Sequence, residues 1–317
     1  MKEVTFLNKN IKRWKKFEVL LSSGPKQEAD NIADLFIKIT DDLSYARTFY
    51  PGSKTTDYLN QLAAKAHTHI YKNKKVKTSR IKTFWTTELP LLMYSSRKEL
   101  FWSFFIFVIS VIVGIISTSH DLNFVRLILG DDYVNTTLEN IQNGDPMAVY
   151  KGAGRTDMFL MITFNNIKVS FLAFVFGIFT AFGTGFLLFR NGIMLGSFQY
   201  FFYQHDMLWE SARTIWIHGT LEISAIILAG CAGMVMGNSL IFPDTLPRKI
   251  SLMRGTRKGI KIIIGIVPLF VVAGFLEGFI TRETHMPLPL NIAIIASSLL
   301  FVIWYFIIYP YSLTKKR

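Results

Sequence analysis

Residues 164–202 read FNNIKVSFLAFVFGIFTAFGTGFLLFRNGIMLGSFQYFF, and residues 215–243 read IWIHGTLEISAIILAGCAGMVMGNSLIFP. Both stretches are almost continuously apolar and rich in glycine, and polar residues that include Asn, His and Glu interrupt them at a few points. Apolar runs of about 20 residues have the length needed to cross the hydrocarbon core of a bilayer. This region therefore predicts a membrane-embedded helical bundle that keeps its polar groups away from lipid.

The composition of the whole chain agrees with that reading. The 317 residues are 50% hydrophobic, yet the formal net charge is +13. Lys and Arg concentrate beside the apolar runs, as the charge bias of a cytoplasmic membrane face predicts, so nucleic acid is not expected as a partner. The single cysteine, Cys231, excludes a disulfide framework. Residues 1–18 lack the apolar segment of a signal peptide.

Residues 1–98 are predicted to form a cytoplasmic helical domain. Apolar residues at helical spacing indicate three short amphipathic helices, separated by Gly24-Pro25 and by Tyr50-Pro51-Gly52. Thr55 or Thr56 is the expected cap of the third helix. The basic run Lys72–Lys82 is open to two interpretations, a juxtamembrane charge cluster facing anionic lipid or a partner-docking site.

Residues 99–317 are predicted to form an all-α, polytopic membrane bundle of about six crossing elements. Arg190-Asn191-Gly192 is read as a turn, which leaves the third element short. An extracytoplasmic segment, residues 119–166, is expected to carry short helices over Phe124–Leu129 and Tyr133–Ile141. The expected spans are Leu100–Ser117, Val169–Phe189, Ile193–Tyr203, Trp216–Phe242, Gly259–Ile280 and Leu290–Ile308.

The distribution of Lys and Arg predicts the orientation. The N-terminal region, the loop after Pro243 and the tail Lys315-Lys316-Arg317 are all basic, and residues 119–166 lean acidic. Cytoplasmic segments carry the excess of Lys and Arg. An even number of crossings is therefore expected, with both termini in the cytoplasm.

A set of short motifs is spread in a fixed order over most of the chain. They are Arg13-Trp14, Asp41–Pro51, Leu59-Asn60, Ala66–Tyr71, Phe164-Asn165-Asn166, Ser170, Gly177, Arg190-Asn191-Gly192, Gly196, His218-Gly219, Glu222, Gly274 and Glu277-Gly278. In their order and spacing these motifs resemble the stage II sporulation protein M family. In endospore formers, this resemblance implies a bacterial inner-membrane partner of peptidoglycan-degrading enzymes during engulfment, and many relatives occur in bacteria that do not sporulate. The partners it implies are the lipid bilayer and envelope membrane proteins or cell-wall hydrolases, and homo-oligomerisation stays open.

His218 and Glu222 are four residues apart and so share one helix face. A carboxylate in the lipid zone costs about 2.5 kcal/mol or more and usually faces the bundle interior or a water cavity. Our hypothesis is a polar pocket that binds a cation, carries protons or recognises a polar headgroup. Its predicted members are His218, Glu222, Glu277, Asn165, Asn166 and Asn191.

Each of these residues also has a purely structural interpretation. His218 and Glu222 would cap neighbouring helix ends, and Glu277 would reach toward the membrane interface. Asn165-Asn166 would cap the second span, and Asn191-Gly192 would only form a turn. The glycines at 177, 183, 185, 192 and 196 are expected to serve helix packing.

Motifs of enzymes are missing from the sequence. It contains neither a His-Glu-x-x-His nor a Gly-x-Ser-x-Gly motif, so a non-enzymatic protein without a cofactor is expected. A His-x-x-x-Glu pair supplies at most two metal ligands, too few for a zinc site, so no metal is predicted. The first hypothesis is a component or scaffold of an envelope complex, and the alternative is a transporter or channel for an ion or a lipid-linked substrate.

Overall fold

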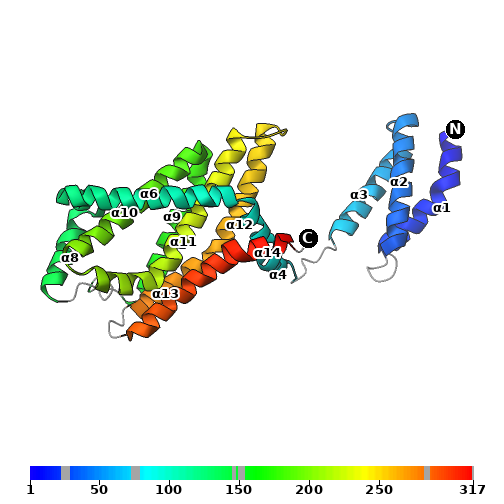
Figure 1. Ribbon diagram of the computed structural model, residues 1–317. Helices are drawn as coiled ribbons and strands as arrows, with labels where there is room; N and C mark the ends of the chain where they lie inside the picture. Colours follow the sequence, from blue (N-terminus) through cyan, green and yellow to red (C-terminus); the bar gives the residue numbers. More distant parts are fainter. Residues whose placement is uncertain (23–28, 73–78, 145–147, 149–153, 282–285, 316–317) are drawn as a thin grey trace. The chain divides into compact units, whose positions relative to one another are not determined.

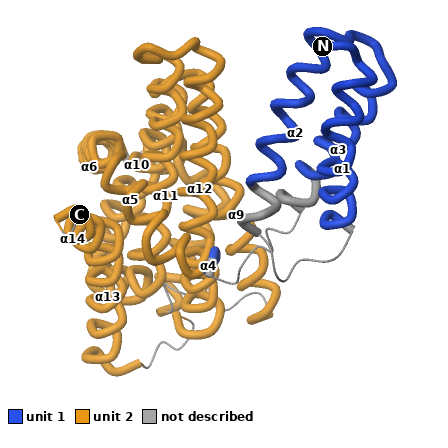
Figure 2. Tube along the Cα trace, turned by 90° about the vertical axis from the view of Figure 1, so that its right-hand side faces the viewer, with its two compact units in different colours: residues 1–81 blue, residues 82–317 orange. Residues whose placement is uncertain are grey.

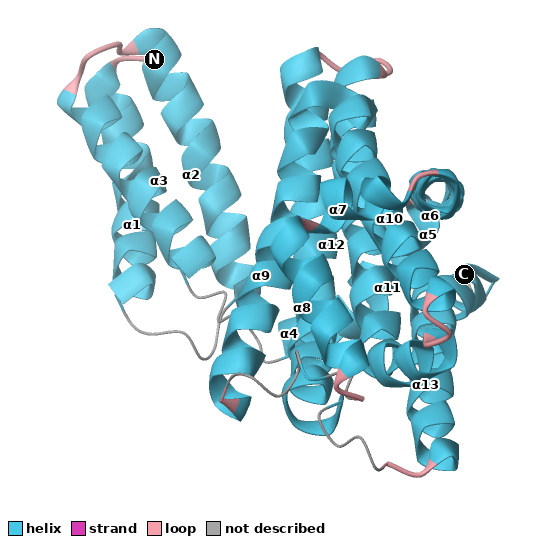
Figure 3. Cartoon of the chain, turned by 90° about the vertical axis from the view of Figure 1, so that its left-hand side faces the viewer, coloured by secondary structure: helices cyan, strands magenta, loops and turns pink. Residues whose placement is uncertain are grey.

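The computed structural model describes residues 1–22, 29–72, 79–144, 148, 154–281 and 286–315. Every regular element within these ranges is helical (Figures 1 and 3), so the all-α prediction is confirmed. The chain divides into two compact units, Met1–Ile81 and Lys82–Arg317 (Figure 2). Each unit has its own buried apolar cluster.

The N-terminal unit packs the helices α1 (Glu3–Ser22), α2 (Ala29–Phe49) and α3 (Lys54–Lys72). Its buried cluster takes residues from all three helices at the spacing that the sequence predicts. Trp14 is fully buried in it and donates its indole N–H to Asp42 Oδ2 over 2.8 Å. The Arg13 guanidinium pairs with the same carboxylate oxygen, so Asp42 links α2 to α1.

The start of α3 differs slightly from the prediction. Ser53 Oγ accepts a hydrogen bond from the Thr56 backbone N–H, so the capping side chain belongs to Ser53 and the prediction of Thr55 or Thr56 was wrong. The Thr56 hydroxyl instead donates to the Tyr50 carbonyl oxygen. The predicted break at Gly24-Pro25 lies outside the described residues, as do residues 73–78 of the basic run.

The boundary between the units falls earlier than the predicted boundary after residue 98. α4 (Ser79–Thr83), a π-helical turn at Phe84–Glu88 and α5 (Leu89–Ser95) follow the N-terminal unit. Leu89 and Met93 are buried in the core of the second unit. The Tyr305 hydroxyl also donates to the Trp85 carbonyl oxygen over 2.6 Å. These contacts join residues 82–98 to the membrane unit.

Within the described residues, five helical segments are long and apolar enough to cross a membrane. The second one, Arg155–Gln204, has 50 residues. At about 1.5 Å per residue it would far exceed a hydrocarbon core of about 30 Å. A 3₁₀ turn at Phe176–Phe179, followed by Thr180 at φ +66°, divides it into α9 (Arg155–Val175) and α10 (Thr180–Gln204).

The crossing helices are therefore α9, α10, α6 (Arg97–His120), α11 (Leu208–Ile241), α12 (Arg248–Phe275) and α13 (Leu288–Ile303). This agrees with the predicted number of crossings, but the predicted turn at Arg190-Asn191-Gly192 was wrong. These residues lie inside α10, which has 25 residues and is not short. Gly192 packs directly against Phe107 and Ser110 of α6, so it serves a helix contact instead of a turn.

Contacts along the bundle fix the direction of each crossing helix. In α6 and α10, Gly192 lies beside Ser110 and Gly196 beside Ile115, so these two helices run parallel. The pairs Asn166–Glu222 and Gly177–Gly233 show that α9 and α11 run parallel to each other.

The remaining contacts show that successive crossing helices run in alternating directions. Leu188 of α10 lies beside Gly230, while Ile215 packs against the cluster that contains Phe201, so α10 and α11 run antiparallel. In α12, Gly255 meets Ser239 and Gly259 meets Ala232, so α12 is also antiparallel to α11. The Asn291 side chain donates to the Arg213 carbonyl oxygen over 3.5 Å, which joins the first turn of α13 to the second turn of α11. The α11–α12 loop and the C-terminal α14 (Tyr309–Lys315) thus share one face with the start of α6.

Two short helices, α7 (Leu122–Leu129) and α8 (Asp131–Gln142), cover the opposite face. Val125 and Val134 pack there against Phe201 and Phe202 at the end of α10. These helices match the predicted elements of the segment 119–166. The prediction was wrong for residues 155–166, because they form the first half of α9.

α11 is the central helix of the membrane unit (Figure 1). Every residue from Leu228 to Gly237 is buried, in the run LAGCAGMVMG. Small side chains let neighbouring backbones approach closely, which is how helices associate in lipid where the hydrophobic effect gives little help. The run therefore explains how one helix can contact α6, α9, α10 and α12.

Candidate functional site

His218 and Glu222 lie on the half of α11 nearer its N-terminal end, one helical turn apart. His218 is buried, and Glu222 is half-buried. From α9, the Asn166 side-chain amide donates a hydrogen bond to Glu222 Oε1. The prediction that Asn165-Asn166 caps a helix was wrong, because both residues lie inside α9, whose capping residue is Gly154.

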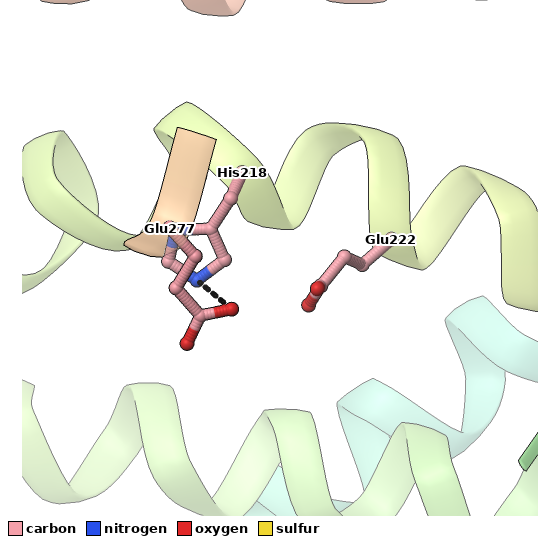
Figure 4. A group of neighbouring side chains, drawn as sticks. All are labelled: His218, Glu222 and Glu277. Atoms are coloured by element: carbon pink, nitrogen blue, oxygen red, sulfur yellow. Dashed lines mark ion pairs between the residues drawn. The ribbon is translucent and has the colours of Figure 1, made fainter. Parts of the chain in front are cut away.

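Glu277 reaches the same place from the end of α12. It lies in a π-helical turn, Leu276–Thr281, that continues this helix. Glu277 is only 8% exposed, so it faces the bundle and does not reach out to the membrane interface. Its Oε2 atom lies 3.7 Å from His218 Nε2 (Figure 4). On the other side of the imidazole, Nδ1 lies 3.0 Å from the Thr281 hydroxyl oxygen.

The three ionisable side chains form one cluster. Figure 4 shows His218, Glu222 and Glu277 directed into the same space, and one ligand atom of each lies within 4.8 Å of the others. We call these three residues the His–Glu–Glu cluster. The His-x-x-x-Glu spacing alone offers two metal-ligand atoms, and the fold adds Glu277 as a third.

A pocket of about 400 Å³ adjoins the cluster between α9, α10 and α11. His218 and Glu222 line it, together with all three asparagines of the predicted pocket, Asn165, Asn166 and Asn191. Asn165 is exposed, so the pocket reaches the surface of the bundle. Asn191 also donates a hydrogen bond to the Leu187 carbonyl oxygen one turn earlier in α10. The structure thus brings the predicted residues together. Glu277 is not among the residues that line the pocket, but it lies beside His218, which does line it.

Two residues of this site were not among those predicted from the sequence. Arg190 was read as part of a turn, yet it lines the pocket from α10. Thr281, which contacts the His218 ring, was not considered. A signal for Arg190 was available, because an arginine inside a long apolar run usually faces the bundle interior or a polar cavity.

The arrangement supplies one imidazole and two carboxylates inside a membrane unit, next to a polar-lined pocket. Such a set can bind a cation, exchange protons or hold a polar group of a ligand. The fold and the cluster together define a polytopic helical membrane protein.

Comparison with known families agrees with this class. Residues 103–282 match the family model of stage II sporulation protein M, which spans more than half of the chain. The chain belongs to the stage II sporulation protein M family. Residues 4–72 match a second family model, described as a domain of unknown function (DUF8413). Comparisons with curated proteins and with solved structures gave no match.

Proposed function

We propose that the protein is a non-enzymatic scaffold of an envelope complex in the bacterial cytoplasmic membrane, with both termini in the cytoplasm. The observation that carries this proposal is the separate apolar core of the N-terminal unit. A helical unit that closes its own core without the membrane-spanning helices is suited to bind a partner. The family resemblance implies that the protein is a membrane partner of peptidoglycan-degrading enzymes, which supports a role in the envelope.

The exposed side of α1 is the surface best suited to such a partner. Lys9, Lys12 and Lys16 are exposed and lie on one stripe of the helix. A stripe of like charge attracts an acidic surface and speeds its association. An acidic cytoplasmic segment of another envelope protein is therefore the partner that we propose for α1.

Cross-linking in native membranes followed by affinity purification of the full chain tests this function. We expect one set of envelope proteins to be recovered with the wild-type chain and lost from the variant Lys9→Glu/Lys16→Glu. The matched control is Lys38→Glu/Lys54→Glu, which makes the same charge change at exposed positions of α2 and α3. Equal recovery with both variants would argue against the lysine stripe, and recovery of no envelope protein at all would argue against the scaffold.

One observation favours transport as a second candidate function. The pocket of about 400 Å³ lies in the membrane unit and is lined by Glu222, Asn166 and Arg190. Ionisable residues at such positions commonly mark ion and substrate pathways. Purified protein in liposomes should then show a flux of ions or of a lipid-linked substrate that Glu222→Gln abolishes. A flux that persists in this variant would remove the pocket from the transport path.

A further inference from the structure

The His–Glu–Glu cluster has the composition of a metal site. Its ligand atoms are one imidazole nitrogen and two carboxylate oxygens, provided by α11 and by the turn at the end of α12. Bonds of about 2.0–2.2 Å to a tetrahedral metal ion put neighbouring ligand atoms about 3.4 Å apart. The separation of 3.7 Å between His218 Nε2 and Glu277 Oε2 is close to that value. A side-chain movement of less than about 1.5 Å would bring in Glu222, whose separation is bounded by 4.8 Å.

The surroundings of the cluster resemble the second layer of a metal site. Thr281 Oγ1 lies 3.0 Å from His218 Nδ1, which leaves Nε2 directed toward the two carboxylates. Metal-binding histidines usually have their other ring nitrogen bonded in this way, which fixes the ring and its tautomer. Asn166 bonds Glu222 Oε1 in the same manner, as ligating carboxylates are bonded.

The turn that carries Glu277 and Thr281 is π-helical. Such turns are rare and occur frequently at functional sites. This turn brings two groups to the cluster. Glu277 offers a carboxylate oxygen, and Thr281, four positions later, contacts the imidazole.

Charge gives an independent reason for a cation. Two carboxylates held among lipid-embedded helices are costly when ionised. Among the described residues, Arg190 of the pocket lining forms no ion pair of 4.0 Å or less with Glu222 or Glu277. A divalent cation between the carboxylates would offset both negative charges.

We propose that His218, Glu222 and Glu277 bind one divalent transition-metal cation of the Zn²⁺ or Mn²⁺ type. An imidazole ligand favours these ions over Mg²⁺ and Ca²⁺, which prefer oxygen alone. Three protein ligands leave a coordination position for water or a polar group, as in open metal sites. The adjoining pocket, which His218 and Glu222 line, gives that position its space. This inference does not depend on the scaffold role.

The test is Zn²⁺ binding to the full-length protein in detergent, purified through a tag without histidine and stripped with a chelator. Calorimetry and elemental analysis should give one Zn²⁺ for each chain. His218→Ala and Glu277→Gln remove ligands and should weaken binding by about 100-fold or more, and Thr281→Ala, which removes the hydroxyl beside Nδ1 of the imidazole, by about 10-fold.

Two matched variants control for nonspecific losses. His120→Ala removes an exposed histidine, and Glu99→Gln removes a carboxylate that pairs with Asn238 elsewhere in the same unit. Both should keep wild-type binding. Binding that is absent from the wild-type chain, or equal in the cluster variants, overturns the proposal. If the cluster variants fail to fold, spin-echo spectroscopy of Mn²⁺ in the wild-type chain decides, because coupling to an imidazole nitrogen is required.

Discussion

Gly177 and Gly233 pack backbone against backbone where α9 ends beside α11. A Cβ atom added to Gly177 would collide with the carbonyl oxygen of Gly233. The contact holds the 3₁₀ turn against the central helix, and it sits where the chain reverses from α9 into α10. Because this reversal leads into α10 and its pocket-lining residues, the approach of two glycines supports the geometry of the candidate site.

We expect Gly233→Val to destabilise the membrane unit. The new side chain would meet the Ala173 carbonyl oxygen and the Thr184 side chain, and forced overpacking of this kind costs about 1–3 kcal/mol. The melting temperature in detergent should fall. Gly185→Val is the matched control, because a Cβ at Gly185 meets only the end of the Ile106 side chain at 3.9 Å. Equal melting temperatures for the two variants would contradict this account of the packing.

In the N-terminal unit, we expect Asp42→Ala to loosen the packing of α1 on α2. The substitution leaves the Trp14 indole N–H and the Arg13 guanidinium without their shared acceptor. An unsatisfied buried donor costs about 1–3 kcal/mol. Hydrogen exchange of the α1 amides in the full chain should become faster. The neighbouring exposed residue provides the control, and Asp41→Ala should leave the exchange rates unchanged.

Tyr58 should make the stability of the N-terminal unit sensitive to alkaline pH. Burial, together with the hydrogen bond that it donates to Glu18, raises the pKa of Tyr58 from 10.0 to about 12. The folded state therefore favours the neutral phenol. Its contribution to stability is complete below pH 10.0 and is lost as the pH rises toward about 12. Over this interval the melting temperature should fall less in Tyr58→Phe than in the wild type, and a parallel fall would contradict the assignment.

Much of the candidate site could be predicted from the sequence, for a physical reason. The spacing of His218 and Glu222 puts them on one helix face, and buried polar groups must find partners in lipid. Glu277 and Asn166 are such partners. The short distance between Glu277 and His218, however, depends on how α12 packs against α11. No local sequence pattern encodes that packing.

The division between the second and third crossing helices could not be predicted in the same way. The real break, Phe176–Thr180, consists largely of apolar residues and carries no turn signal, and it depends on a threonine at positive φ. Asn191-Gly192 does carry a turn signal. In the bundle its glycine is needed for contact with α6 instead, so tertiary packing decided against the local preference.

The alternation of the six crossing helices predicts opposite accessibility for two loops. Thr245 lies in the α11–α12 loop, on the basic face, and Asp132 lies in α8 on the other face. Both side chains are exposed, and Cys231 is buried, so Cys231→Ser gives a background for single-cysteine labelling. In intact cells, a membrane-impermeant maleimide should label Asp132→Cys at once and Thr245→Cys only after permeabilisation. Labelling of both from outside would mean that α11 does not cross the membrane between them. The orientation drawn from the lysine and arginine distribution would then be wrong, and the lysine stripe of α1 would have no basis for its cytoplasmic partner.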